Sequence, residues 1–221
     1  MRYITFDATN NVYVFGDIHQ EQIPDFTILC QGYTFCCCRL LLRTWIPFFE
    51  KLQSFKEKTV DILDLDDSRY HPDIIHALLA YCHCRNIDLD IQEDNLPNLI
   101  EHAGYWEYDD FIIWLLDHYG YPDFYLFYSA LQQVTLDENK IRLALALLEI
   151  LEIPLQEESN ILLTWLREAP LSLTDKILNH YTCPEAIREG YKLITCQNLP
   201  YNDISKTCYP YCFRTQLAVA S

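Results

Sequence analysis

The sequence predicts an α/β domain, a small sheet capped by helices, that is preceded by a β-hairpin and followed by an all-helical region. Two observations carry this prediction. Apolar side chains alternate with others along 26–30, as expected of a strand with one apolar face, and helical spacing of apolar residues begins soon afterwards. Beyond position 121, helical patterns follow one another without a competing strand pattern.

Composition limits the classes of partner. The chain has 221 residues, half of them apolar, which suffices for the core of one large domain or two small ones. Its formal net charge is −16, the wrong sign for binding a phosphate backbone or an anionic membrane leaflet. No signal-peptide pattern is present, and no segment reaches the roughly 18 uncharged residues that a bilayer span needs. We expect an intracellular protein, in the cytoplasm or nucleus, with neither nucleic acid nor membrane as a partner.

Ten cysteines are present, and their spacing favours reduced thiols. Cys36, Cys37 and Cys38 are consecutive, which suits buried thiols better than a secreted disulfide framework. A structural zinc ion takes four converging ligands, commonly as two close pairs. The candidate set for such a site lies in the C-terminal part: Cys183, Cys196, Cys208 and Cys212. The alternative is that exposed thiols of the tail pair under oxidation, and no cofactor is expected.

Two hairpins are predicted at the start of the chain. The segment 2–15 reads as a hairpin that turns at Asn10-Asn11. A second hairpin follows, with Gln31-Gly32 as its turn.

Helices are predicted after the second hairpin. The first is expected to close on Pro47, Phe48 and Phe49. Its expected apolar stripe consists of Leu40, Leu41, Trp45, Phe48 and Phe49. The next helix begins near Pro72, where the missing N–H group costs nothing. Its expected buried face consists of Ile74, Ile75, Leu78, Leu79 and Cys82.

The remaining sequence predicts further helices. One opens at Pro122, and another covers 136–151 with Asp137 as its cap. Two more are expected after 151–170, near Ser172 or Thr174 and near Pro184. An irregular tail is expected beyond them.

These elements carry a resemblance to a known family. The residues 25–49 read D-F-T-I-L-C-Q-G-Y-T-F-C-C-C-R-L-L-L-R-T-W-I-P-F-F, followed by V-D-I-L at 60–63 and H-P-D-I-I-H-A-L-L-A-Y at 71–81. N-L-P-N-L-I-E-H-A-G-Y-W-E-Y-D-D-F follows at 95–111, and the whole resembles the BTB/POZ domain. The segment 151–170 resembles the helix-loop-helix of the BACK domain, with Trp165 at its tryptophan position.

The resemblance implies a division of the chain and a class of function. We expect a hairpin extension at 1–22, a BTB/POZ-like domain at 23–120 and a BACK-like helical region at 121–221. The implied function is non-catalytic protein recognition, with other proteins or further copies of the chain as partners.

Four residues are implied as interaction sites. Asp25 and Arg39 stand where many BTB domains form a charged pocket near a dimer seam, and an ion pair that only organises the fold is the alternative. Phe55 and Glu57 match the pattern of a hydrophobic residue, any residue and an acid that adaptors use to bind a cullin. The alternative is a solvated loop with one core-facing phenylalanine. The usual helix before Asp25 is absent, which argues against the usual dimer.

Two functions of the module remain open, together with a remote third. The chain is an adaptor of a cullin-type ubiquitin ligase, or a structural or scaffolding protein that self-associates or joins a larger assembly. Standalone BTB-BACK proteins are familiar from large DNA viruses, so a virion-associated role belongs to the second hypothesis. The third is an enzyme, because Asp17 and His19 have the spacing of the first metallophosphoesterase motif. The glycine-marked motifs that this chemistry needs do not follow.

Overall fold

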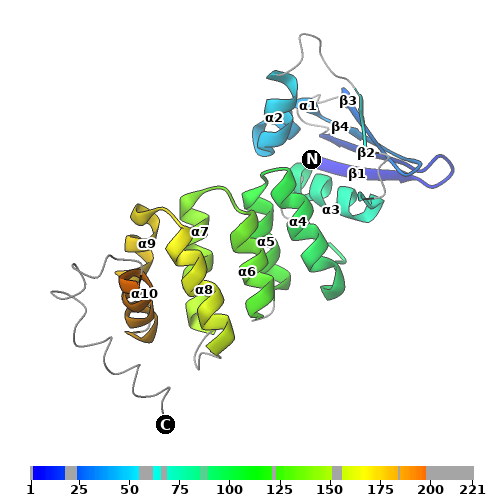
Figure 1. The fold of residues 1–221 in the computed structure, drawn as a ribbon. Coiled ribbons are helices and arrows are strands. Elements are labelled where there is room, and N and C mark those ends of the chain that lie inside the picture. The colour runs from blue at the N-terminus through cyan, green and yellow to red at the C-terminus, as the bar shows by residue number, and fades with distance from the viewer. Residues whose placement is uncertain are drawn as a thin grey trace. The chain divides into compact units, whose positions relative to one another are not determined.

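The computed structural model describes two compact units, Met1–Asn139 and Lys140–Ser221, and each is considered by itself (Figure 1). Together the described residues are 2–17, 24–54, 62–65, 69–85, 87, 89–120, 123–150, 156–183 and 185–197.

The first unit contains a five-stranded mixed sheet in the order β1-β2-β4-β3-β5. The strands are β1 (Arg2–Asp7), β2 (Val12–Asp17), β3 (Phe26–Cys30), β4 (Tyr33–Cys37) and β5 (Ile62–Asp64). The pairs β1–β2 and β3–β4 are antiparallel hairpins, whereas β2–β4 and β3–β5 are parallel. Because β2 pairs with β4, the N-terminal hairpin supplies two strands of the same sheet.

Both predicted hairpin turns are confirmed. Asn11 has a φ of 52° at the end of the first turn, which the Asp7 carboxylate stabilises by accepting hydrogen bonds from the following residues. Gln31 and Gly32 have φ values of 46° and 79°. Positive φ at both central positions gives a two-residue turn the twist that adjacent strands need.

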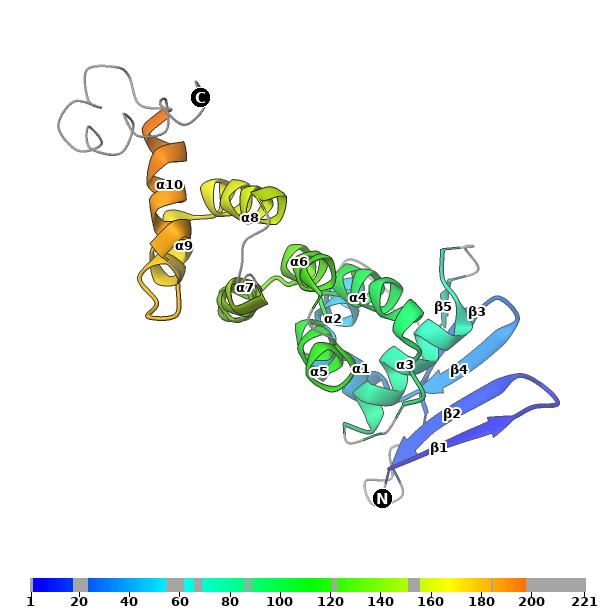
Figure 2. The same cartoon turned by 90° about the horizontal axis from the view of Figure 1, so that it is seen from below.

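Helices cover one face of this sheet in layers. In the first unit they are α1 (Arg39–Trp45), α2 (Pro47–Ser54), α3 (Pro72–His83), the short 3-10 helix η1 (Glu93–Asn95), α4 (Leu96–Tyr105), α5 (Asp109–Tyr119) and α6 (Phe124–Gln133). Helix α3 packs against β2 and β4 and also contacts α1 and α4. Figure 2 shows the sheet on one side of α3 and the helices α4 and α5 on the other.

The core lies between the sheet and α3, where the predicted patterns are confirmed. Side chains along β3 alternate between buried and half-buried, with Phe26, Ile28 and Cys30 pointing inward. Every residue of the expected α3 face is buried: Ile74, Ile75, Leu78, Leu79 and Cys82. Helix α3 begins at Pro72, as predicted, and the His71 side chain accepts a hydrogen bond from the Asp73 N–H group.

The expected first helix is wrong in two respects. It ends at Trp45, and Pro47 begins a second helix instead of closing the first. Ile46 between them is extended, with φ −125° and ψ 102°, because a residue before proline is driven away from helical angles. The expected stripe is also displaced: Leu40 is 62 % exposed and Trp45 is 38 % exposed. The side chains that α1 buries are Leu41 and Leu42.

Close contact between α4 and α6 depends on a glycine. A Cβ atom added at Gly104 would collide with the Gln133 side chain. The missing side chain therefore allows α4 to pack closely against α6. Ala103 of α4 and Ala130 and Leu131 of α6 are buried.

The second unit is helical throughout its described part. Helix α7 (Asp137–Ile150) leads into it, followed by α8 (Gln156–Glu168), α9 (Leu171–Leu178) and α10 (Glu185–Gln197), so that the further helices expected there are confirmed. Helices α8 and α10 pack together, and the Thr174 hydroxyl of α9 donates to the Leu166 carbonyl of α8 at 2.9 Å. None of the helices described in either unit has the length and apolar character needed to cross a membrane.

Candidate protein-interaction site

Asp25 and Arg39, two of the predicted site residues, lie against each other at the start of α1. The Asp25 Oδ1 atom accepts a hydrogen bond from the Arg39 backbone N–H group at 2.8 Å, and Arg39 Nη2 donates to the Asp25 carbonyl at 3.0 Å. Arg39 Nε lies 3.8 Å from Asp25 Oδ2. The carboxylate side chain is 58 % exposed and the arginine 14 %, so the pair is open to solvent on the acidic side. Asp25 therefore caps α1 from a distant position in the sequence.

His83 provides a second acceptor at the same helix end. Its Nε2 atom lies 3.2 Å from the backbone nitrogen of Cys38, and its Nδ1 atom lies 2.9 Å from the Leu79 carbonyl oxygen. A carbonyl oxygen can only accept, so Nδ1 carries the hydrogen and Nε2 accepts from Cys38. The buried ring is thus a neutral structural link between α1 and α3. The sequence did not reveal this structural role, because His83 simply stands between Cys82 and Cys84.

Arg85 is a further residue whose role the sequence did not reveal. Its guanidinium carbon lies 4.1 Å from the ring centre of Trp45 and 4.7 Å from that of Tyr81. The ring of Tyr108 lies at 5.7 Å, and Asp110 Oδ2 lies 3.5 Å from Nη1. Burial raises the pKa of the Tyr108 hydroxyl well above its ordinary value. The stacked guanidinium thus links α1, α3 and α5. It also packs over the ring of Trp45, a residue that is not part of the buried core.

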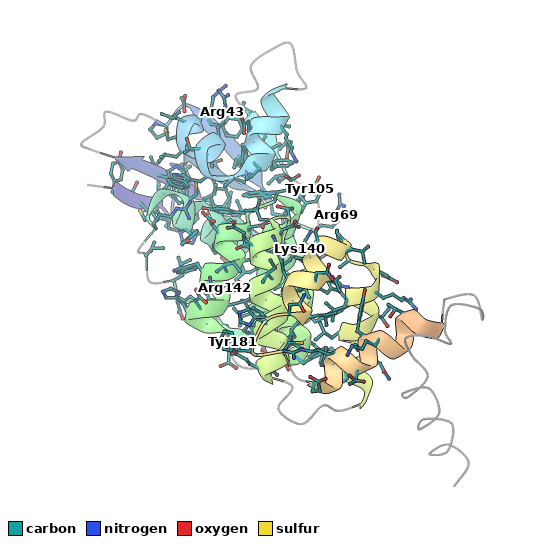
Figure 3. All side chains as sticks on the ribbon, turned by 90° about the vertical axis from the view of Figure 1, so that its left-hand side faces the viewer. Arg43, Arg69, Tyr105, Lys140, Arg142 and Tyr181 are labelled. Atoms are coloured by element: carbon teal, nitrogen blue, oxygen red, sulfur yellow. The ribbon has the colours of Figure 1, made fainter. Side chains whose placement is uncertain are left out.

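An exposed aromatic patch lies where α2 and the end of α4 meet. We call it the α2–α4 face, and it consists of Phe48, Lys51, Tyr105 and Glu107. The Tyr105 ring is 60 % exposed and its centre lies 5.7 Å from that of Phe48. Lys51 Nζ donates to the Glu107 carboxylate beside them. Figure 3 labels Tyr105 among the side chains of the first unit. Aromatic residues with a charged rim are typical of protein-binding surfaces.

From the end of β2 into α5, the first unit corresponds to a known module. Residues 16–115 match the family model of the BTB/POZ domain. Residues 16–115, a little under half of the chain, are thus assigned to this domain. This confirms the resemblance drawn from the sequence, and the BTB/POZ domain is generally a non-catalytic protein–protein interaction module. No curated protein matches the chain.

The two residues expected to bind a cullin, Phe55 and Glu57, lie outside the described residues. Helix α2 ends at Ser54 and β5 begins at Ile62, so 55–61 connects these two elements within the matched region.

The candidate zinc set is described only in part. Cys183 is buried, and burial raises the pKa of its thiol, an effect that Arg188 opposes. Cys196 belongs to α10 but its side chain is not described, and Cys208 and Cys212 lie outside the described residues. Among the residues that the structure describes, no group of three or more histidine, cysteine or acidic side chains is placed to hold a metal ion. The zinc site stays a prediction.

The motif that suggested a phosphoesterase falls at the edge of the described chain. Asp17 is the last residue of β2, as a strand-ending motif requires, but its side chain is not described and His19 lies outside the described residues. Gly16 before it packs against the Tyr3 ring of β1.

Helical structure follows the BTB/POZ domain, in agreement with the sequence. Helix α6 begins at Phe124 with Asp123 as its cap, since the Asp123 carboxylate accepts from the Leu126 N–H group at 2.7 Å. Trp165 is half-buried on α8. The family match ends at 115, so the BACK-like interpretation of 121–221 stays a prediction.

Proposed function

We propose that this chain is an adaptor of a cullin-type ubiquitin ligase, with its BTB/POZ domain as the cullin-binding part. The observation that carries the proposal is the α2–α4 face. Helix α2 contributes Phe48 and Lys51 to this face, and the same helix runs directly into the segment that holds Phe55 and Glu57. A partner that binds Phe55 and Glu57 would therefore also contact α2, because these residues directly follow it in the sequence.

The chemistry of this region suits a hot spot with a charged rim. A phenylalanine that enters a pocket on the partner supplies most of the affinity, and neighbouring charges orient the partner. Tyr105 extends the apolar area beyond α2, while the Lys51–Glu107 pair borders it. The helices after the BTB/POZ domain, interpreted as BACK-like, would present a client. An adaptor of this kind acts in the cytoplasm or nucleus.

Binding of a purified cullin N-terminal domain to the full chain, measured by calorimetry, tests the proposal. We expect wild type to bind and the double variant Phe55→Ala with Glu57→Ala to lose at least about tenfold in affinity, because removal of a hot-spot residue costs at least about 2 kcal/mol. The matched control is Phe6→Ala with Glu93→Ala, which removes an exposed phenylalanine and an exposed acid from β1 and η1.

The outcomes separate the adaptor from its alternatives. Thermal unfolding of each variant shows whether the fold survives. Absence of wild-type binding, or equal losses in the two double variants, would reject the adaptor. Binding that survives both changes would place the cullin elsewhere on the chain.

A scaffolding role is the second candidate, and the sheet edge favours it. In the described part of the chain, β1 pairs with β2 on one side and its other side faces no described strand. Unpaired edge strands readily pair with another chain. If the chain is a scaffold, light scattering should show that its average molecular mass rises with protein concentration. Such self-association would suit a component of a larger assembly, for example a virion. A constant monomer mass, together with cullin binding, would leave the adaptor alone.

A further inference from the structure

A pocket of about 530 Å³ lies beside the sheet, away from the α2–α4 face. Its walls come from β1, the first turns of α3, the segment 87–91 and the start of α4. The volume is in the range of sites that enclose a small ligand or an anchoring side chain.

The floor of the pocket is aliphatic. Ile74 and Leu99 are almost fully buried, while Ile4, Ile87 and Ile91 are half-buried and reach the opening. Half-buried branched side chains around a hollow give an apolar group a favourable place, since each Å² of apolar surface removed from water contributes about 25 cal/mol.

The described rim carries two acidic side chains, and the Nδ1 atom of the rim residue His71 lies 3.4 Å from Asp73 Oδ2. Asp73 and Asp90 both line the pocket and are exposed, and Asn98 adds a neutral polar group. No lysine or arginine is among the described residues that line this pocket. The lining residue His76 is partly buried, and burial lowers its pKa, so it is uncharged at neutral pH. An anion would be repelled here, whereas a cation on an aliphatic stem would match both floor and rim.

The neighbouring edge of β1 indicates what kind of ligand carries this chemistry. Ile4 belongs both to the pocket and to β1, whose outer edge faces no strand in the described chain. An extended peptide that pairs with this edge would project alternate side chains to one side, at the spacing that reaches a pocket next to the strand.

We propose that this pocket is a second protein-binding site, and that it takes an extended basic peptide with an aliphatic side chain seated on Ile4, Ile74 and Leu99. Lysine or arginine residues two positions before and two positions after that anchor project to the same side of the strand, where they pair with Asp73 and Asp90. The site is separate from the cullin surface, so it supplies the adaptor with a place for a client segment or the scaffold with a place for a partner. It does not depend on which of those roles holds.

The direct test is methyl NMR of the full chain labelled at isoleucine. The probe is the synthetic peptide Val-Lys-Val-Ile-Val-Lys with blocked ends, which places isoleucine and both lysines on one side of the strand, and the charge-reversed comparison is Val-Glu-Val-Ile-Val-Glu. We expect the basic peptide to shift the methyl signals of Ile4, Ile74, Ile87 and Ile91, and the acidic peptide to leave them unchanged. Equal shifts from both peptides, or no shift at these methyls, would overturn the proposal.

Charge variants give an independent readout that leaves the core untouched. Asp73→Asn with Asp90→Asn should weaken binding about three- to tenfold, because each exposed ion pair contributes up to about 1 kcal/mol. The matched control, Glu93→Gln with Asp94→Asn, removes two exposed acids that do not line the pocket, and should change affinity less than about twofold. Equal losses in both pairs would reduce the effect to net charge and reject the site.

Two further arms identify the occupant. Hexylammonium alone should bind far more weakly than the peptide, and equal affinity would make this a site for small amines. Concentration-dependent shifts of the same methyls without peptide would assign the pocket to a second copy of the chain and overturn the proposal. Cullin binding by the Asp73 and Asp90 variant should be unchanged, so failure here is distinct from failure of the adaptor.

Discussion

The ring of Tyr13 on β2 lies 4.7 Å from the imidazole of His76 on α3, and Phe15 lies 6.1 Å from the same imidazole. Burial against these rings lowers the pKa of His76 below its ordinary 6.5, and the Asp73 carboxylate only partly opposes this. As pH falls through 6.5, the unfolded chain takes up a proton at His76 before the folded chain does. The neutral ring therefore stabilises the fold fully above that pH, and this contribution is lost toward the lower, folded-state pKa.

We expect His76→Gln to flatten the fall in unfolding free energy between about pH 7 and pH 5. Urea denaturation at a series of pH values measures the slope. His71→Gln is the control, since the His71 side chain is 63 % exposed and is not packed against the sheet aromatics. NMR titration of Asp73→Asn should place the pKa of His76 lower still, because one favourable charge is gone. A slope unchanged by His76→Gln would contradict this account.

Local sequence patterns correctly predicted the helices and turns for which a single pattern of residues is decisive. The periodicity of α3 and the chemistry of two turns at Asn11 and Gln31-Gly32 were each sufficient. The end of α1 was not predictable in this way, because three consecutive leucines fit either face of a helix. Pro47 also gave two opposite signals, since proline both stops a preceding helix and favours the first turn of a new one.

The sites were predictable only where a resemblance linked distant residues. The pairing of Asp25 with Arg39 came from the family pattern; the two residues do lie against each other, whereas a charged pocket at a dimer seam stays a prediction. The contacts of His83 and Arg85 depend on how α1, α3 and α5 pack, and no local spacing encodes such packing. The pocket at Ile4 likewise requires β1 to lie next to α3, which follows from the β2–β4 pairing.

Asp25 is expected to stabilise the fold chiefly as a cap. Asp25→Ala removes the acceptor for the Arg39 N–H group and should cost about 0.5–2 kcal/mol of unfolding free energy, whereas Asp25→Asn keeps an oxygen there and should cost less. Urea denaturation compares them, with Asp94→Ala as the exposed control. Equal losses in the alanine and asparagine variants would show that charge, and not capping, is the contribution of Asp25.

Replacement of Arg85 by lysine should be destabilising although it keeps the charge. A lysine cannot place a planar cation over both Trp45 and Tyr81, and each such contact contributes about 0.5–1 kcal/mol at a partly exposed site. We expect a loss of about 1–2 kcal/mol in chemical denaturation. Arg43→Lys, at an exposed position of α1 (Figure 3), is the control and should change little. A silent Arg85→Lys variant would show that stacking contributes nothing.

The buried carboxylate of Asp109 connects the start of α5 to the link between α6 and α7. It accepts from the backbone N–H groups of Thr135 at 3.0 Å and Leu136 at 2.8 Å, and from the side-chain amide of Asn139 at 3.0 Å. Asp109→Ala would leave two backbone donors without this acceptor, each costing about 1–3 kcal/mol where water cannot replace it. Urea denaturation should show a loss of at least about 2 kcal/mol.

Asp110→Ala is the matched control for Asp109, because it removes a neighbouring acid in the same helical turn. Its side chain is 58 % exposed and pairs only loosely with Arg85, so we expect a loss below about 1 kcal/mol. Thr135→Val separates the hydroxyl from the backbone donors and should cost less than Asp109→Ala, since the N–H groups keep their acceptor. If Asp109→Ala proves no worse than Asp110→Ala, solvent reaches these donors and the carboxylate does not hold the link.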